Sequence, residues 1–177
     1  MNANLKTRRL FFALWPTEPV RKSIVEAALP VSQKIKGRII QPHNLHITLH
    51  FIGQVSEDIK DCMHNAAHAV AGNSFHVDLD RFGHFPRAKV FWMGAQVLPA
   101  ELTRLHDKLG DALEKCGYQC DKRPYNPHVT LMRKCMRINA GQPGFSIPWA
   151  VNEFVLVESI QDVSGVNYQV IEHYPLS

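Results

Sequence analysis

A short pattern that places a threonine two residues after a histidine occurs twice in this sequence. Residues 46–49 read His-Ile-Thr-Leu and residues 128–131 read His-Val-Thr-Leu, so the copies begin 82 positions apart. In a β-strand, residues i and i+2 point to the same face, so each histidine projects beside its threonine. The aliphatic residues of each copy point the other way, toward a core. Two matching copies predict an internal duplication that brings two imidazoles to one site.

Two facing imidazoles suit the cleavage of a cyclic phosphodiester. Opening the ring requires a base that activates water and an acid that protonates the leaving oxygen, and in-line displacement places the two groups on opposite sides of phosphorus. Imidazole changes its charge near neutral pH and serves in either role. His46 and His128 are therefore the predicted catalytic residues, and Thr48 and Thr130 are predicted to donate hydrogen bonds to the phosphate oxygens. This chemistry requires no metal and no other cofactor.

The hydrophobic pattern around the motifs predicts short strands and three helices. Thr17 is the expected N-cap of the first helix and Pro30 its expected end, while Pro86 suits a loop between two strands. The other helices are expected over 56–71 and 99–116, and strands over 10–15, 44–52, 75–80, 89–94, 128–132, 151–159 and 167–171. This order of elements predicts an α+β fold with largely antiparallel sheets.

Composition restricts the class of protein. The 177 residues are 45% hydrophobic and 20% charged, which indicates one globular domain over residues 1–177 or two small lobes that share one core; in the second case the repeat would put one motif in each lobe. No apolar run approaches the roughly 20 residues of a membrane helix, and Pro16 interrupts the first one early. We therefore expect a cytoplasmic protein without a signal peptide or a membrane span. The net charge of +4 suits an anionic partner such as a nucleotide or RNA.

Cysteines and spaced histidines offer a second kind of chemistry, which the sequence does not favour. The four cysteines, at 62, 116, 120 and 135, form no Cys-x-x-Cys pair, so reduced thiols are expected and a zinc site is not. His64 and His68 stand four apart on a predicted helix, which is metal-ligand spacing, but no third ligand lies nearby in the sequence. A polar helix face is the favoured interpretation.

The motifs and their flanks resemble the two-histidine phosphoesterases, and among them the bacterial RNA 2′,3′-cyclic phosphodiesterases, also called 2′-5′ RNA ligases. The likeness is carried by residues 9–14, 44–53, 90–94 and 123–133. The resemblance implies a bilobal fold in which two mainly antiparallel sheets line a central groove, with helices outside and a pseudo-twofold duplication. It also implies hydrolysis of the 2′,3′-cyclic phosphate of RNA ends or nucleosides to a 2′-phosphate, with His128 as the base and His46 as the acid. We expect a monomer.

Two residues near the motifs have uncertain faces. Arg133 lies five residues after His128, an odd offset that puts it on the opposite face of a regular strand. A strand that ends near residue 132 removes this objection, and the resemblance implies that Arg133 contacts phosphate; the alternative is a surface arginine. His50 shares the face of His46 if its strand is regular, which places it at the rim of the groove or makes it a solvated strand histidine.

Two aromatic residues are candidates for contact with a nucleobase. Phe12 resembles the aromatic residue that stacks on a base in this family, and the alternative is a core phenylalanine. Tyr125 precedes the second motif and either lines the groove or packs the turn made by Pro124 and Pro127.

Two other functions remain open. The same groups run in reverse would join RNA ends through a 2′-5′ linkage, which product analysis at high RNA concentration would detect. A nucleotide-binding module without catalysis is the alternative from another class, and an assay on a nucleoside 2′,3′-cyclic phosphate separates it from the enzyme.

Overall fold

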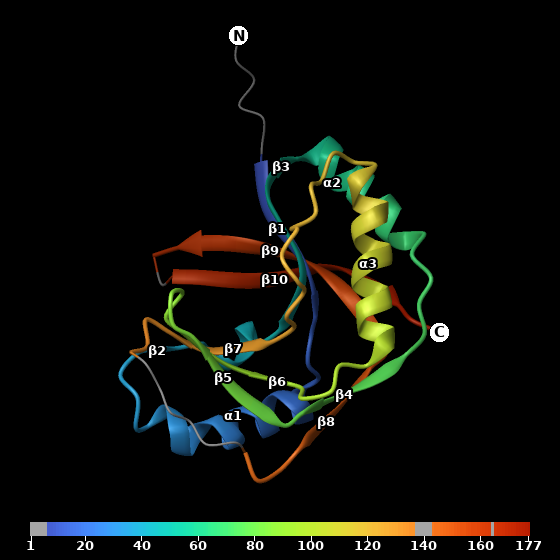
Figure 1. Cartoon of the computed structure of the whole chain (residues 1–177). Coiled ribbons are helices and arrows are strands. Elements are labelled where there is room, and N and C mark those ends of the chain that lie inside the picture. Colours follow the sequence, from blue (N-terminus) through green and yellow to red (C-terminus); the bar gives the residue numbers. More distant parts are fainter. Residues whose placement is uncertain (1–6, 137–142, 164) are drawn as a thin grey trace.

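The computed structural model describes residues 7–136, 143–163 and 165–177 (Figure 1). The helices in these ranges are α1 (Glu18–Ser32), η1 (Pro42–Asn44, a 3-10 turn), α2 (Glu57–His68) and α3 (Ala100–Glu114). The strands are β1 (Thr7–Leu14), β2 (Arg38–Ile39), β3 (Ile47–Ser56), β4 (Phe75–Leu79), β5 (Arg81–Phe85), β6 (Val90–Gly94), β7 (Val129–Arg133), β8 (Ile147–Val151), β9 (Glu153–Asp162) and β10 (Gly165–Pro175).

Most strands belong to one antiparallel sheet. Its order is β10-β9-β1-β3-β7-β6-β5, with β2 also paired to β7, while β4 and β8 form a separate pair. The motif strands β3 and β7 are neighbours, and their register in the described chain joins Ile47 with Val129. The predicted α+β class with mainly antiparallel strands is confirmed. The prediction of two sheets is corrected: the strands on either side of this junction are two halves of one sheet.

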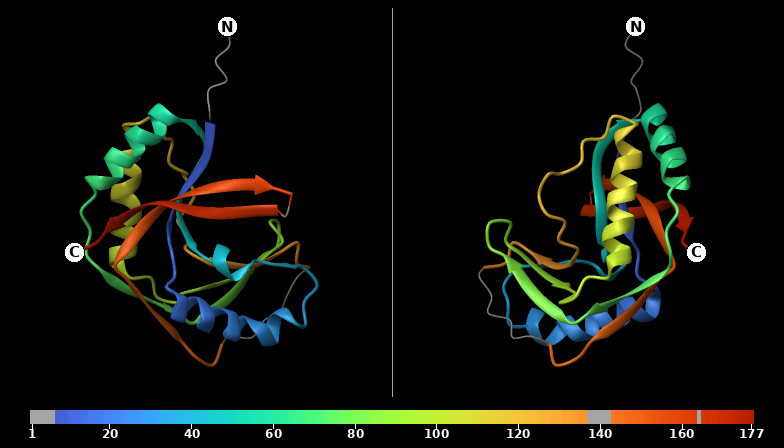
Figure 2. Two further views of the ribbon diagram at one scale, coloured as in Figure 1. Left: turned by 180° about the vertical axis from the view of Figure 1, so that it is seen from behind. Right: turned by 45° about the vertical axis from the view of Figure 1, so that its right-hand side comes forward.

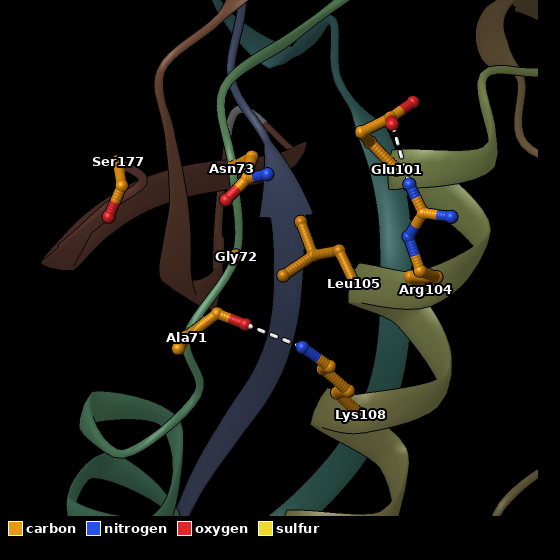
Figure 3. A pocket seen from close by; sticks show the side chains of 8 residues that line it. All are labelled: Ala71, Gly72, Asn73, Glu101, Arg104, Leu105, Lys108 and Ser177. Atoms are coloured by element: carbon orange, nitrogen blue, oxygen red, sulfur yellow. Dashed lines mark hydrogen bonds and ion pairs between the residues drawn. The ribbon is translucent and has the colours of Figure 1, made fainter.

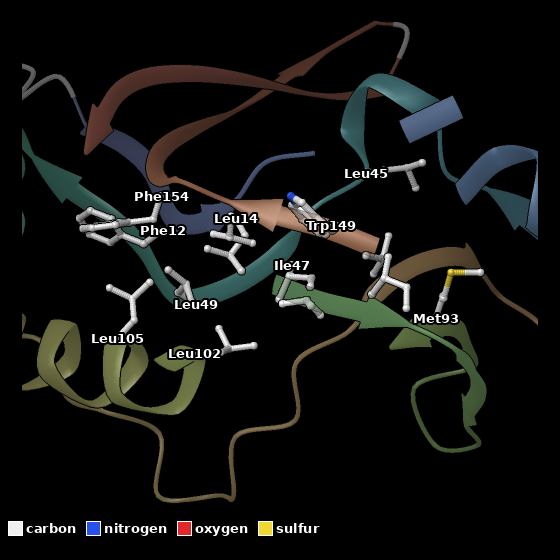
Figure 4. Close-up of a cluster of buried hydrophobic side chains, with 14 of the residues drawn as sticks. Phe12, Leu14, Leu45, Ile47, Leu49, Met93, Leu102, Leu105, Trp149 and Phe154 are labelled. Carbon is white, nitrogen blue, oxygen red and sulfur yellow. The ribbon is translucent and has the colours of Figure 1, made fainter. Parts of the chain in front are cut away.

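The helices cover the face of the sheet that the aliphatic motif residues occupy. Helices α2 and α3 pack side by side against β3, and α1 packs against β8 and η1 (Figures 1 and 2). The apolar stripe of α3 is fully buried because its leucines recur every three or four residues: Leu102, Leu105, Leu109 and Leu113. Figure 4 shows two of them facing Leu49 and the Phe12–Phe154 pair. No helix in the described ranges has the length and hydrophobicity to span a membrane.

Several boundaries differ from the sequence prediction. Helix α1 continues through Pro30 to Ser32, although a proline there removes the amide donor that would bond to the Glu26 carbonyl; the helix ends within three residues of it. Thr17 occupies the N-cap position of α1, but its side chain makes no capping hydrogen bond, whereas Ser56 caps α2 by accepting from the Ile59 amide. Strand β5 forms where a loop was expected. It contains Gly83 and pairs with β6 along its whole length.

The prediction of four reduced cysteines is wrong. Cys62 on α2 and Cys116, two residues after α3, form a disulfide with their Cα atoms 5.9 Å apart. The spacing of 54 residues gave no signal of this pairing, because only the packing of α2 on α3 brings the two positions together. Cys120 and Cys135 are free thiols.

Candidate active site

Both motifs present their polar pair on one face of the sheet. Ile47 and Val129 have 1% and 0% of their surface exposed, while the histidine and threonine that flank each of them stay partly exposed. The antiparallel pairing of Ile47 with Val129 places the beginnings of the two motif strands side by side. We call the side of the sheet that carries His46, Thr48, His128 and Thr130 the motif face.

The two imidazoles are held in the same way. Nδ1 of His46 lies 2.8 Å from the carbonyl oxygen of Asn44, and Nδ1 of His128 lies 2.8 Å from that of Asn126. A carbonyl only accepts, so each Nδ1 carries the proton and each Nε2 is left as the basic nitrogen of the neutral ring. Nε2 of His46 lies 3.1 Å from the Thr48 hydroxyl, which donates to it.

Two asparagines hold these imidazoles, and the His-x-Thr-Leu pattern leaves them out. The repeat extends two residues further than His-x-Thr-Leu, because residues 44–49 and 126–131 both read Asn-x-His-x-Thr-Leu. Asn44 is buried, and its side chain is fixed on β10: it donates to the Val166 carbonyl at 3.0 Å and accepts from the Tyr168 amide at 3.1 Å. The carbonyl that orients His46 is therefore anchored to a strand on the far side of β1 and β9 in the sheet.

Irregular pairing brings Arg133 to the motif face. Thr130 is paired with Trp92 and Met132 with Phe91, so Leu131 is an additional residue in β7. This β-bulge shifts the alternation by one residue, and Arg133 returns to the face of Thr130. The odd offset from His128 is thereby resolved by a bulge, and β7 continues through Arg133 rather than ending before it.

The matching bulge in β3 moves His50 away from the motif face. Thr48 pairs with Ala13 and His50 with Phe12, which makes Leu49 the additional residue. His50 is therefore only 3% exposed and lies on the helix-covered face, where its Nε2 is 2.8 Å from the His106 carbonyl oxygen of α3. The expectation of a groove-rim or solvated histidine is wrong, because it assumed regular alternation.

Burial and positive charge lower the pKa of both motif histidines. The pKa of His46 is lowered to about 4, mainly by burial and also by the charges of His128 and Arg133, against the opposing effect of the Asn44 carbonyl. Burial and Arg133 also lower the pKa of His128. His46, His128 and Arg133 therefore interact electrostatically, and without a bound anion both rings are neutral at pH 7.

Aromatic rings surround each imidazole. The His46 ring stacks on Trp15 at a centroid distance of 5.5 Å and contacts Phe11 at 4.8 Å and Tyr168 at 5.3 Å. The His128 ring meets Phe85 edge-on at 5.0 Å and lies 6.0 Å from Trp92. These rings supply the low-polarity surroundings that disfavour the charged imidazolium.

The predicted role of Phe12 in stacking on a nucleobase is wrong. Phe12 has no exposed surface and packs in the main core against Phe154 and Tyr174, with ring centroids 6.3 and 5.9 Å away. The alternation of β1 places Phe11, its neighbour, on the motif face beside His46 instead.

Tyr125 joins the two motif segments. Its hydroxyl donates to the main-chain carbonyl of Thr48 at 3.0 Å, and its ring stacks on His106 at 3.8 Å. Burial raises the pKa of the phenol well above its ordinary value, so the hydroxyl remains a donor. The segment before β7 is thus tied to β3, while contact of Tyr125 with a nucleobase stays a prediction.

A cavity beside α3 and the two spaced histidines of α2 lie outside the motif face, and the side chains described there already have partners. A cavity of about 160 Å³ lies between residues 71–73, α3 and the C-terminus, and its cations are already engaged: Lys108 with the Ala71 carbonyl and Arg104 with Glu101 (Figure 3). His64, one of the spaced pair on α2, bonds to the Tyr174 hydroxyl at 3.0 Å. Among the residues that the structure describes, no three histidine, cysteine or acidic side chains gather as metal ligands.

The chain is similar in sequence and in structure to several known proteins. The RNA 2′,3′-cyclic phosphodiesterase of Escherichia coli K12 is 29% identical over 171 residues, which cover 96% of this chain and 97% of the relative. The Thermus thermophilus protein of the same name is 30% identical over 182 residues, covering 95% and 90%. The crystal structure of Escherichia coli LigT complexed with 3′-AMP matches with a TM-score of 0.91 at 29% identity, covering 97% of this chain and 99% of that one.

A family model agrees with these relatives. The model of the 2′-5′ RNA ligase superfamily matches residues 16–161, a range that includes both motifs, Arg133 and the strands that hold them. The family model agrees with the repeated histidine–threonine pair on adjacent strands and with the matching fold. This chain therefore belongs to the 2′-5′ RNA ligase superfamily.

Proposed function

We propose that this chain hydrolyses the 2′,3′-cyclic phosphate of RNA ends or nucleosides to a 2′-phosphate, by acid–base catalysis between two histidines and without a metal. The observation that carries the proposal is the duplicated imidazole geometry, in which Nδ1 of His46 and Nδ1 of His128 are each fixed on a carbonyl and the Nε2 atoms are left for proton transfer. The names of the relatives support the substrate class.

The reaction consists of one in-line displacement. The base takes a proton from water as the water oxygen forms a bond to phosphorus, and the bond from phosphorus to the 3′ oxygen breaks. The acid donates its proton to that oxygen, so the 3′ hydroxyl is restored and the phosphate remains on the 2′ oxygen. The family resemblance assigns the base to His128 and the acid to His46.

The lowered pKa values explain why catalysis would depend on the substrate. A neutral Nε2 at pH 7 suits the base, but the acid must carry a proton before it can donate one. An anionic phosphate bound between His46, His128 and Arg133 offsets the positive charge of Arg133 and favours the imidazolium form. The negative charge of the bound substrate would therefore raise the pKa of the acid histidine and favour its protonated form.

The threonines and Arg133 complete the phosphate site. The hydroxyls of Thr48 and Thr130 and the guanidinium of Arg133 stand on the motif face with the two histidines, where they can donate to the non-bridging oxygens. These donors stabilise negative charge as it develops on the phosphate in the transition state.

Product analysis tests the proposal. The purified protein is incubated with adenosine 2′,3′-cyclic phosphate in the presence of EDTA, and the adenosine 2′- and 3′-monophosphates are separated by chromatography. We expect the 2′-monophosphate at a rate that EDTA leaves unchanged. Formation of the 3′-monophosphate, or activity lost with EDTA and restored by zinc or manganese, would contradict the mechanism. Binding without turnover would indicate a nucleotide-binding module instead.

A further inference from the structure

Four exposed cations lie near the end of β7, and one of them, Arg133, belongs to the motif face. Arg133 ends β7, Lys134 follows it, Arg38 lies on the neighbouring β2, and Lys89 precedes β6. The register pairs Arg133 with Arg38 on one side and with Val90, the residue after Lys89, on the other. We call Arg38, Lys89, Arg133 and Lys134 the cation strip.

The positive charge of the cation strip is not neutralised by carboxylates in the part of the chain that the structure describes. None of its members forms an ion pair with a carboxylate in the described ranges of the chain, although cations elsewhere, such as Arg8, Arg21 and Lys60, do. Arg38 and Arg133 stand directly opposite each other on adjacent strands, and like charges in that position destabilise a sheet. An arrangement that is unfavourable in the free protein becomes favourable when a polyanion lies across it.

The backbone of the cation strip is also unusual. Lys89 and Lys134 are the non-glycine residues with positive φ in the described chain, at 53° and 58°. Only a small part of conformational space is open to side-chain-bearing residues there, and such strain clusters at functional sites. The Lys89 carbonyl accepts a hydrogen bond from the Cys135 amide at 3.0 Å, which ties the two lysine positions together.

Close packing holds β2 against β7. Gly37 precedes Arg38, and a Cβ atom at position 37 would lie 2.7 Å from Cys135 Sγ and 3.0 Å from the Arg133 carbonyl oxygen. The absence of a side chain at this position lets Arg38 approach Arg133 at the spacing of paired strands, about 5 Å. Arg38 and Arg133 are therefore presented by paired strands, while Lys89 lies in the turn before β6 and Lys134 in the bend after β7, next to the hydrogen bond from the Cys135 amide to the Lys89 carbonyl.

We infer that the cation strip binds the sugar–phosphate backbone of a single RNA strand, so that the protein acts on oligonucleotide ends in preference to mononucleotides. The inference rests on the proposed function, because the cyclic phosphate bound at the two histidines fixes the strand. That group is the 3′ end of the strand, and the remaining phosphates extend in the 5′ direction. Arg133 holds the terminal phosphate, and Arg38, Lys89 and Lys134 receive the phosphates that precede it.

A charge-neutral triple variant tests the inference. Arg38→Gln, Lys89→Gln and Lys134→Gln are combined, with Arg133 kept intact. The control combines Lys22→Gln, Arg104→Gln and Lys108→Gln, which remove the same charge from α1 and α3. Affinity for a fluorescently labelled single-stranded RNA of about ten nucleotides is measured by anisotropy over a range of salt concentrations. In parallel, kcat/KM is measured for a cyclic-phosphate RNA and for adenosine 2′,3′-cyclic phosphate.

The expected result separates the two substrates. The strip variant should bind RNA about tenfold more weakly than wild type, and the slope of log affinity against log salt should become shallower by about 2 for three lost contacts. Its kcat/KM on the mononucleotide should match that of wild type and of the control. Equal RNA affinity and equal salt slopes in the strip and control variants would overturn the inference even with hydrolysis intact. Absent hydrolysis with the salt slope changed would overturn the proposed function and the preference for oligonucleotide substrates, and would leave the cation strip as an RNA-binding surface.

Discussion

The chemistry of the motif face depends on which nitrogen of each histidine is free. The carbonyls of Asn44 and Asn126 hold Nδ1 of His46 and His128, so the same Nε2 tautomer is set at both positions. Arg133 adds a fixed positive charge that disfavours a second proton on either ring. Each histidine therefore has a defined atom for proton transfer and a pKa that responds to a bound anion.

Removing either imidazole should abolish most of the catalysis. We expect His46→Ala and His128→Ala each to lower kcat for cyclic phosphate hydrolysis by about two to four orders of magnitude, the usual contribution of one general acid or base. KM should change much less, because Thr48, Thr130 and Arg133 still bind phosphate. His76→Ala, an exposed histidine on β4, is the control. A folded variant of either motif histidine that kept normal turnover would contradict the two-histidine mechanism.

Arg133 should control the pH dependence. Both histidines have a lowered pKa in the free protein, so the bell-shaped profile of kcat/KM should be centred below the ordinary histidine value of about 6.5. Arg133→Gln removes the positive charge that lowers both pKa values, and the profile should move to higher pH as activity falls. Rates measured from about pH 5 to pH 9 check this shift. A rate that rises steadily with pH in wild type would point to hydroxide and against an acid–base pair.

The strands place these residues through irregular pairing. In each motif strand the leucine that ends the motif is an additional residue, Leu49 in β3 and Leu131 in β7, and β3 has a second one at Ile52. The shift turns Arg133 toward the motif face and turns His50 into the packing beneath α3. The same structural device therefore adds a charged group to the motif face in one half of the sheet and removes a titratable one in the other.

The bond from Tyr125 to β3 should matter for catalysis although the residue is not catalytic. Tyr125→Phe deletes the hydroxyl that donates to the Thr48 carbonyl, which should cost about 1 kcal/mol of the free energy of unfolding. Because the same bond aligns the two motif segments, we expect kcat to fall about tenfold with KM unchanged. The matched control is Tyr174→Phe, which deletes a hydroxyl bonded to His64 on the far face. Equal kcat in the two variants would show that Tyr125 has no positioning role.

The packing of the whole molecule joins segments that the sequence separates widely. One cluster of buried side chains includes residues from both halves of the sheet and all three helices, so the motif strands rest on a shared core. The disulfide fastens α2 to the end of α3, near the chain that leads to Tyr125 and the second motif. Stability and the relative position of the motifs are therefore linked.

Loss of the disulfide should lower global stability more than activity. The bond between Cys62 and Cys116 closes a loop of 54 residues, and constraining the unfolded chain in this way contributes about 2 to 4 kcal/mol. Urea unfolding with and without a thiol reductant should show that loss in wild type. The Cys62→Ser, Cys116→Ser double variant should already have the lower stability and should not respond to the reductant. Identical unfolding curves for oxidised and reduced wild type would contradict a stabilising role.

Local patterns in the sequence are enough to predict the α+β class, the four motif side chains and the catalytic chemistry that these side chains suggest. These features follow from local alternation: residues 46–49 and 128–131 show one buried and one polar face without reference to any partner. The sequence repeat also includes an asparagine two residues before each histidine, and the carbonyl of that asparagine orients the imidazole ring. Alternation cannot, however, predict where a strand gains a residue.

The positions of Arg133, His50 and Phe12 and the state of the cysteines depend instead on contacts between distant segments of the folded chain. The bulges arise from the register of β3 with β1 and of β7 with β6, so the faces of Arg133 and His50 depend on strands distant in the chain. Phe12 and Phe11 are both apolar, and only the direction of β1 over the core decided which one reached His46. Cys62 and Cys116 meet because α2 packs on α3. Each outcome depends on contacts between distant segments, which no local pattern encodes.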